Sequence, residues 1–135
     1  MKFQEIILKR GPCYGPCPVY SVTIHNDGSV EWKGDLFVKE EGPRTWSISQ
    51  KKIDALDKAI DKVKFMELRD KYDEYEVTDH PDATITVKFK EGTKKKVYHY
   101  FGDSSVPRVL EWLEIKIDKI AGTEPYVGPD FWEDA

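Results

Sequence analysis

Two kinds of apolar spacing in this sequence predict an α+β fold, a two-layer sandwich in which a mainly antiparallel sheet carries two helices on one face. Several short segments alternate apolar with polar residues, which is typical of half-buried strands. Two longer segments repeat apolar residues at spacings of three and four, which is typical of amphipathic helices. In chain order the predicted elements are ββββ-α-ββ-α.

The first third of the chain predicts an antiparallel meander of four strands. Tyr20, Val22 and Ile24 alternate with polar residues. Residues 26–28 (Asn-Asp-Gly) then signal a hairpin, because these residue types tolerate the positive φ of a tight turn. The predicted strands are residues 3–8, residues 19–25, a return strand through Val30 and Trp32, and residues 36–40, which resume briefly near Trp46 and Ile48 after a break at Gly42-Pro43.

The first predicted helix covers about residues 50–64. It begins after Ser49, whose hydroxyl can accept a free backbone N–H of the first turn. Its apolar stripe is Ile53, Leu56, Ile60 and Val63, and Phe65, Met66 and Leu68 are expected to cover its C-terminal end. The polar stretch 70–82 that follows has no clear period and predicts a long loop.

A second hairpin, with strands at residues 84–90 and 95–101, precedes the second predicted helix. Ser104 or Ser105 can cap this helix, and Pro107 suits its first turn, where a missing N–H costs little. Gly122 suits the position just after the helix, where a left-handed residue is common. The apolar stripe of this helix is Val106, Leu110, Leu113, Ile117 and Ile120.

These elements predict one α+β domain over residues 1–122. An aromatic and acidic tail, residues 123–135, follows and is expected to dock in part on the domain. The whole chain has 135 residues, and a domain of this size buries about two-thirds of its unfolded surface, so that one core can hold it together.

The charge balance argues against nucleic acid as a partner. Charged residues make up 34% of the chain, but the two signs are mixed and the net charge is −4, whereas a phosphate backbone is bound by a basic face. No apolar run approaches the ~20 residues of a membrane span, and residues 3–8 lack the features of a signal peptide. The sequence as given therefore predicts a cytoplasmic protein, or the mature part of an exported protein whose leader has been removed.

The least generic segment is the loop at residues 11–18, Gly-Pro-Cys-Tyr-Gly-Pro-Cys-Pro. Its three prolines fix their own φ angles and restrict the residues before them, so the loop is stiff before folding begins. The favoured interpretation is structural, with Cys13 and Cys17 either buried as thiols or joined in a local disulfide.

Two chemical interpretations of the cysteines stay open beside the structural one. A redox pair would need an activated thiolate, but the CxxxC spacing and Pro16 and Pro18 argue against a helix N-terminus that would lower a thiol pKa. Two thiolates with an imidazole would suit copper(I) or zinc. The string CxxxCP resembles the copper-binding loop of Sco-type proteins, although the rest of the chain does not resemble their thioredoxin fold.

Other residues are weaker candidates. The acidic stretch 73–82 offers Asp79 and His80 on a loop, where binding residues are common, but it lacks the spacing of a calcium-binding loop. His99 lies in a predicted strand and is expected to fill a face of the sheet. The sequence shows no nucleophile elbow, phosphate-binding glycine loop or zinc-protease motif, and so it favours a role other than catalysis.

Several segments together resemble the uncharacterised domain of unknown function family 6438. They are residues 8–20 (LKRGPCYGPCPVY), 22–28 (VTIHNDG), 34–38, the helix after Ser49, 77–84 (VTDHPDAT) and 117–122 (IDKIAG), of which the GPCxGxCPVY string is the most specific. The resemblance implies importance for Cys13, Tyr14, Cys17, Tyr20 and Asp79, and implies no established activity. Members of the family often look exported, whereas this sequence shows no leader.

Two classes of function follow. The favoured one is a small binding or interaction module for an unknown protein or small ligand, in which the Cys13/Cys17 loop is structural and Tyr14, Tyr20, Asp79 and His80 are candidates for binding. The alternative is a thiol-based protein that binds copper or zinc, or does redox work, through Cys13 and Cys17.

Overall fold

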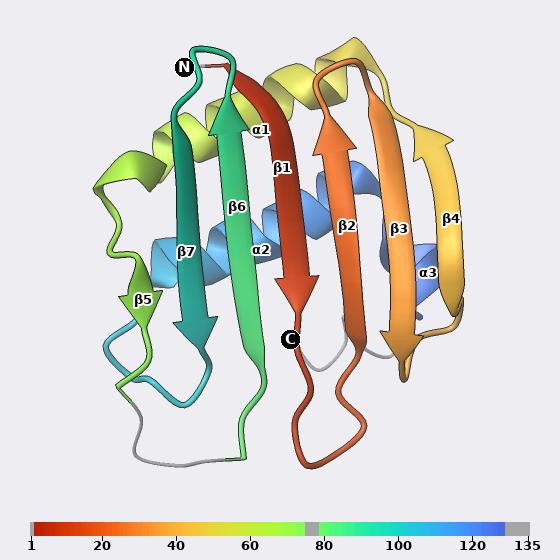
Figure 1. Cartoon of the computed structure of the whole chain (residues 1–135), viewed down its shortest axis with the longest axis vertical. Coiled ribbons are helices and arrows are strands. Elements are labelled where there is room, and N and C mark those ends of the chain that lie inside the picture. Colours follow the sequence, from red (N-terminus) through yellow and green to blue (C-terminus); the bar gives the residue numbers. More distant parts are fainter. Residues whose placement is uncertain (1, 75–78, 129–135) are drawn as a thin grey trace.

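The computed structural model describes residues 2–74 and 79–128 of the chain, and Figure 1 shows their arrangement. The elements in chain order are β1 (Phe3–Arg10), β2 (Val19–His25), β3 (Ser29–Leu36), β4 (Gly42–Ser47), α1 (Gln50–Lys62), the short 3₁₀ helix η1 (Phe65–Glu67), β5 (Lys71–Tyr72), β6 (Asp82–Phe89), β7 (Lys94–Tyr100), α2 (Arg108–Ala121) and α3 (Glu124–Val127).

All seven strands form one sheet, in the order β4-β3-β2-β1-β6-β7-β5. Every neighbouring pair is antiparallel except β5 and β7, which are parallel. The first strand of the chain therefore lies in the middle of the sheet, where Ile6 is opposite Ile24 on one side and opposite Val87 on the other.

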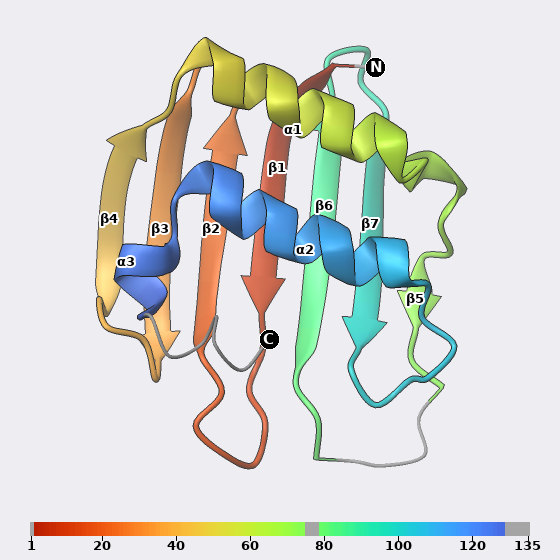
Figure 2. The ribbon, with the colours of Figure 1, turned by 180° about the vertical axis from the view of Figure 1, so that it is seen from behind.

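Both long helices cover the same face of this sheet (Figure 2), which confirms the predicted α+β class and the predicted order of elements, apart from the additional short strand β5. The core lies between the two layers, because the long strands turn an apolar face toward the helices. Its largest fully buried aliphatic side chains are Ile6, Leu8, Ile24, Leu56, Ile60, Ile85, Leu110 and Leu113. Among the described residues no helix covers the opposite face, which we call the open face, and the residues that alternate with the core positions point to it.

The helix ends agree only in part with their sequence signals. Ser49 caps α1 as predicted, since its hydroxyl accepts the backbone N–H of Lys52, and Gly122 ends α2 with a φ of 82°. The prediction that Ser104 or Ser105 caps α2 is wrong, because Pro107 holds the cap position without a side-chain hydrogen bond. Ser105 is occupied elsewhere, with its N–H and its hydroxyl both donating to Asp103.

The predicted fourth strand is confirmed near Trp46, which lies in β4, but it is wrong at residues 36–40. Leu36 ends β3, and residues 37–40 turn the chain, with Phe37 in the left-handed region at a φ of 53°, so that β4 begins only at Gly42. The turn folds back over β3 so closely that any side chain on Gly34 would collide with the carbonyl oxygen of Glu40. The indole N–H of Trp32 donates to that same carbonyl at 3.0 Å, so a tertiary contact fixes the turn where alternation alone suggested a strand.

Two other expectations, one about the loop at residues 70–82 and one about the end of α1, are met only in part. The predicted loop at residues 70–82 contains β5, whose two residues pair with β7, while residues 75–78 of that loop lie outside the described part of the chain. Of the three residues expected to cover the end of α1, Phe65 is buried, whereas Met66 is 39% exposed.

The beginning of the tail packs against the sheet as the short helix α3. The ring of Tyr126 stacks on Trp46 at 4.4 Å between centroids, and Val127 is buried beside Trp32. The backbone N–H groups of Lys39 and Glu40 donate to the carbonyls of Val127 and Tyr126. The rest of the predicted tail, residues 129–135, lies outside the described ranges.

Candidate functional site

The cysteine loop joins β1 to β2 at one end of the sheet and is closed by a disulfide. The Sγ atoms of Cys13 and Cys17 lie 2.00 Å apart, and their Cα atoms lie 5.8 Å apart. The backbone N–H of Gly15 donates to the Sγ of Cys13 at 3.2 Å. Both cysteines are half-buried. The disulfide thus closes the loop near the surface. The sequence alone had left open whether the two cysteines are thiols or a disulfide.

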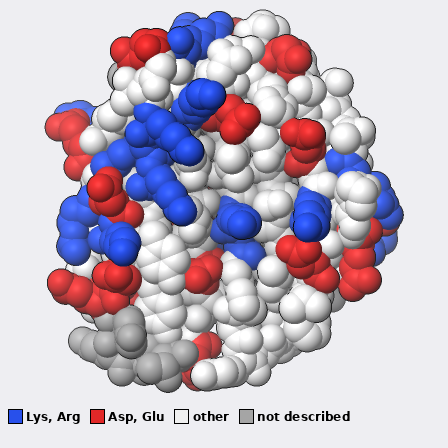
Figure 3. All heavy atoms as spheres, in the orientation of Figure 1, with Lys and Arg blue, Asp and Glu red and all other residues white. Residues whose placement is uncertain are grey.

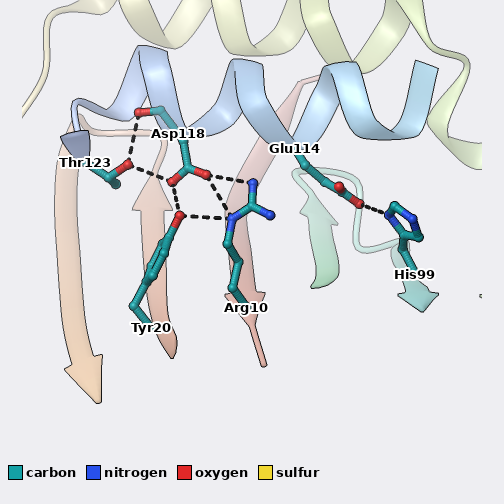
Figure 4. Close-up of polar contacts among 6 residues, drawn as sticks. All are labelled: Arg10, Tyr20, His99, Glu114, Asp118 and Thr123. Carbon is teal, nitrogen blue, oxygen red and sulfur yellow. Dashed lines mark hydrogen bonds and ion pairs between the residues drawn. The ribbon is translucent and has the colours of Figure 1, made fainter. Parts of the chain in front are cut away.

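A buried polar network holds the base of this loop (Figure 4). Arg10 is the last residue of β1, Tyr20 lies opposite it on β2, and both point toward α2. The guanidinium of Arg10 donates to Asp118 at 3.0 and 3.2 Å and to the hydroxyl of Tyr20 at 3.0 Å. The Tyr20 hydroxyl in turn donates to Asp118 at 2.8 Å, and Thr123 donates to the same carboxylate at 2.7 Å. We call these four residues the clamp.

The clamp pairs the buried guanidinium of Arg10 with the buried carboxylate of Asp118. Burial alone would lower the pKa of Arg10, but the fields of Tyr20, Asp118 and Glu114 outweigh it and raise that pKa. Burial, and then the field of Asp118, raise the pKa of Tyr20 well above its usual value. Arg10 is therefore a cation and Tyr20 a neutral phenol, and Asp118, with no exposed surface, receives hydrogen bonds from both. This arrangement suits a structural role, because all four side chains are buried.

A second buried pair joins α2 to β7. The Nδ1 of His99 lies 2.7 Å from a carboxylate oxygen of Glu114, and the imidazole stacks on Phe101 with 4.1 Å between ring centroids. Glu114 and Asp118 are one helical turn apart, so α2 directs two acids at two basic side chains of the sheet (Figure 4). Both pairs fix how α2 lies on the strands.

The Glu114 pair gives the protein a pH-dependent stability. Burial raises the pKa of Glu114 above its ordinary value of 4.5, and this effect outweighs the opposing ones of His99 and Arg10. The folded protein then holds this proton more tightly than the unfolded chain, so the free energy of unfolding falls as pH rises from about 4.5 through the raised pKa. We expect Glu114→Gln to remove this part of the slope in urea unfolding measured across that range. The exposed control Glu111→Gln should keep the slope, and equal slopes for both variants would contradict the assignment.

The surface beside the cysteine loop holds a small apolar pocket of about 60 Å³. Gly11 belongs to its wall, and a side chain there would collide with the carboxylate of Asp82. The backbone N–H of Gly11 donates to the carbonyl of Asp82 at 3.0 Å. The pocket is lined by Arg10, Gly11, Cys17, Pro18, Pro81, Asp82 and Phe101.

The same end of the sheet carries the most exposed large apolar side chains of the described residues. Tyr14 is 86% exposed at the tip of the cysteine loop, while Leu36 at the end of β3 and Phe37 in the turn after it are 51% and 60% exposed. Leu36 pairs with Val19, just after the loop, and Figure 1 shows the loop and the turn at the same end of the sheet. We call Tyr14, Leu36 and Phe37 the loop-end surface.

The predicted site residues divide between these features. Cys13, Cys17 and Tyr14 form the loop, while Tyr20 is buried in the clamp beneath it. Asp79 and His80 are exposed on the connection that leads into β6. The backbone N–H of His80 donates to the hydroxyl of Tyr100 at 3.3 Å, and the next residue, Pro81, reaches the pocket beside Cys17.

Sequence reasoning missed Arg10, Glu114 and Asp118, although each had a signal. Arg10 continues the buried alternation of Ile6 and Leu8 along β1. The two acids directly follow Leu113 and Ile117, which belong to the apolar stripe of α2. A charged residue on a buried face requires a partner. His99 fills the buried face of its strand, as expected.

Removing the disulfide is expected to lower the free energy of unfolding by about 2 kcal/mol, because it closes a loop of only about five residues. The change is Cys13→Ser with Cys17→Ser, measured by urea unfolding against the oxidised parent. The reduced parent serves as control and should match the variant. A loss well above this value would show that the loop contributes to the core.

Within residues 2–74 and 79–128, no group of three or more His, Cys, Asp and Glu side chains is placed to hold a metal ion. The copper or zinc site predicted at Cys13 and Cys17 stays a prediction. Over the same ranges, no helix is long and apolar enough to cross a membrane.

The family model described as Domain of unknown function (DUF6438) matches residues 4–121, which include the cysteine loop and every residue labelled in Figure 4 except Thr123. No curated protein matches the chain.

Proposed function

We propose that this chain, which belongs to the DUF6438 family, is a binding module that recognises a protein segment at its loop-end surface. The observation that carries the proposal is the exposure of Tyr14, Leu36 and Phe37 at one end of the sheet. Exposed apolar surface is typical of interaction sites, and tyrosine is enriched among the residues that dominate binding energy.

The loop is preorganised for such a role. The disulfide and the three prolines restrict the backbone on either side of Tyr14, and the clamp fixes the strands from which the loop starts. An anchor that is rigid before binding loses less conformational entropy when the complex forms.

The backbone conformation of Phe37 also supports a binding role for the loop-end surface. Its φ of 53° is costly for a bulky residue, yet the aromatic ring stays 60% exposed and so gains little from the core. Strained residues of this kind cluster at binding sites.

The test uses loss of binding by variants that preserve the fold. Peptides selected from a random displayed library against the folded protein are expected to lose at least about tenfold in affinity for Tyr14→Ser with Phe37→Gly, since truncated anchors of this type cost more than about 1.4 kcal/mol. Glycine suits the φ of residue 37, so the turn should survive.

The matched control is Trp112→Ser, which removes an exposed aromatic residue from the outer side of α2 and should leave peptide affinity unchanged. Peptides that bind the double variant as tightly as they bind the parent would contradict the proposal. A photo-reactive residue at position 14, compared with one at position 51 on α1, then shows whether the native partner contacts the same surface.

A second candidate function uses the cysteines themselves. The observation in its favour is that both sulfurs belong to residues that are only half-buried. A dithiol reductant could exchange with the Cys13–Cys17 disulfide, leaving two protein thiols and an oxidised reductant, and the thiolates could then bind copper(I) or zinc. Native mass spectrometry of the reduced protein with each metal tests this idea, and a mass that neither metal changes would refute metal binding.

The disulfide also bears on location. Disulfides persist mainly in oxidising compartments. Of the two locations that the sequence left open, we therefore favour the mature part of an exported protein.

A further inference from the structure

The open face of the sheet contains a hollow of about 580 Å³ on the side of β6 and β7, away from the loop-end surface. Side-chain length explains its shape. Thr84 and Thr86 on β6 are short, and strand pairing surrounds them with long side chains. Lys9 and Tyr98 lie opposite Thr84 on its two sides, Lys96 lies opposite Thr86, and Lys71 lies beyond Tyr98 on β5.

The hollow is cationic although the whole chain carries a net charge of −4. Among the described residues, its lining has three lysines, Lys9, Lys71 and Lys96, and one carboxylate, that of Asp73. Within the described residues, no ion pair joins any of these three lysines to an acid. Figure 3 shows this face, with basic side chains gathered over β6 and β7.

We propose that this hollow binds an acidic oligosaccharide, a sugar chain that carries carboxylate or sulfate groups. The lysines supply the charge complementarity. The hydroxyls of Thr84 and Thr86 can donate to or accept from sugar hydroxyls. The Tyr98 ring gives a firm wall, because its hydroxyl donates to Asp82 at 3.0 Å.

Backbone pairing favours this class over an acidic peptide. An extended peptide gains most of its affinity by adding to a free strand edge. The strand at the centre of the hollow, β6, is paired on both sides, with β1 and β7. A ligand over β6 must therefore be recognised by side chains. An acidic sugar chain, which is dense in hydroxyl and anionic oxygens, offers these side chains more contacts than a peptide does.

The row of basic residues continues beyond the hollow. Lys9 lies opposite Ser21 on β2, and Ser21 lies opposite Lys33 on β3. Neighbouring strands are about 4.8 Å apart, so Lys33 and Lys71 stand about 24 Å apart across the sheet. This length suits an oligomer of several sugars running across the strands.

The experiment is an amide chemical-shift titration of the full chain with four probes: tetragalacturonate, a heparin-derived tetrasaccharide, neutral maltotetraose and hexaglutamate. At least one of the two acidic sugars is expected to bind more tightly than maltotetraose and hexaglutamate. The amide chemical shifts should change on β1, β6 and β7 rather than at the cysteine loop. Its affinity should fall as salt is raised, because the contacts are between charges at the surface. Binding of neither acidic sugar, or binding of hexaglutamate as tight as the tighter sugar, would overturn the proposal.

Two sets of variants locate the site. Lys9→Ser with Lys71→Ser and Lys96→Ser should weaken the acidic sugar at least about tenfold, since three charge contacts are removed. The control Lys51→Ser with Lys52→Ser and Lys58→Ser makes the same charge change on exposed positions of α1, on the other face, and should bind normally.

Thr84→Val with Thr86→Val keeps every charge and suits a strand, yet removes both hydroxyls. We expect it to weaken sugar binding by at least about fivefold, because losing two hydrogen bonds costs about 1 kcal/mol or more. Unchanged affinity in this variant would reduce the interaction to general attraction between charges and refute recognition of a sugar. All these variants leave the loop-end surface intact. A negative result for sugar binding therefore does not bear on the proposal that this surface binds a peptide.

Discussion

Replacing Asp118 with alanine is expected to lower the free energy of unfolding by about 3–5 kcal/mol, because it removes the carboxylate that accepts two hydrogen bonds from the buried guanidinium of Arg10. The same change removes the carboxylate oxygen that accepts from the hydroxyls of Tyr20 and Thr123. Urea unfolding followed by tryptophan fluorescence measures the loss. Asp54→Ala, which removes an exposed carboxylate from α1, should change stability by only about 0.5 kcal/mol.

A combined substitution separates charge burial from other causes. Replacing a whole buried ion pair by apolar side chains is often neutral, whereas breaking the pair is costly. Arg10→Met with Tyr20→Phe and Asp118→Leu is therefore expected to be more stable than Asp118→Ala alone. If Asp118→Ala stays within about 1 kcal/mol of the parent, the clamp does not hold the loop in the way its geometry indicates.

Trp32→Ala is expected to cost about 3–5 kcal/mol, the usual range for deleting a large buried aromatic side chain. Trp32 stacks on Tyr20 at 4.6 Å between ring centroids and contacts the ring of Tyr126 at 5.7 Å. Its indole N–H also holds the carbonyl of Glu40, so the β3–β4 turn and α3 should loosen together. Hydrogen exchange should then show reduced protection of the Lys39 and Glu40 amides.

Trp112→Ala is the matched control, since Trp112 is 36% exposed on α2, with the ammonium of Lys62 at 4.9 Å from its ring centroid. We expect a loss of about 1 kcal/mol or less, the range of an exposed cation–π contact. Equal losses for the two tryptophans would contradict the assignment of Trp32 to the core.

The fold class follows from the sequence because each element is recorded in local spacing. The alternation of Tyr20, Val22 and Ile24 and the stripe of Ile53, Leu56 and Ile60 needed no tertiary information. The sheet order was beyond such reasoning, because the pairing of β1 with β6 depends on contacts across most of the chain. The turn after β3 was missed for the same reason, since Gly34 and Trp32 fix it through Glu40.

The candidate site divides in a similar way. The stiffness of the cysteine loop could be read from its prolines, but the sequence alone could not decide between thiols and a disulfide. The clamp was not predicted, because Arg10, Tyr20 and Asp118 meet only when α2 lies on the sheet. The hollow on the open face also depends on register, which places short threonines between lysines of other strands.

The central position of β1 has a consequence for the order in which the protein can assemble during synthesis. Residues 3–10 can pair with β2 as soon as residues 19–25 have been made, but their other edge stays unpaired until residues 82–89 have been made. Contacts so distant along the chain slow folding, and an unpaired strand edge attracts other chains. The nascent chain therefore passes through a stage in which an apolar strand is half-covered, and this stage is where a chaperone would have most effect on yield.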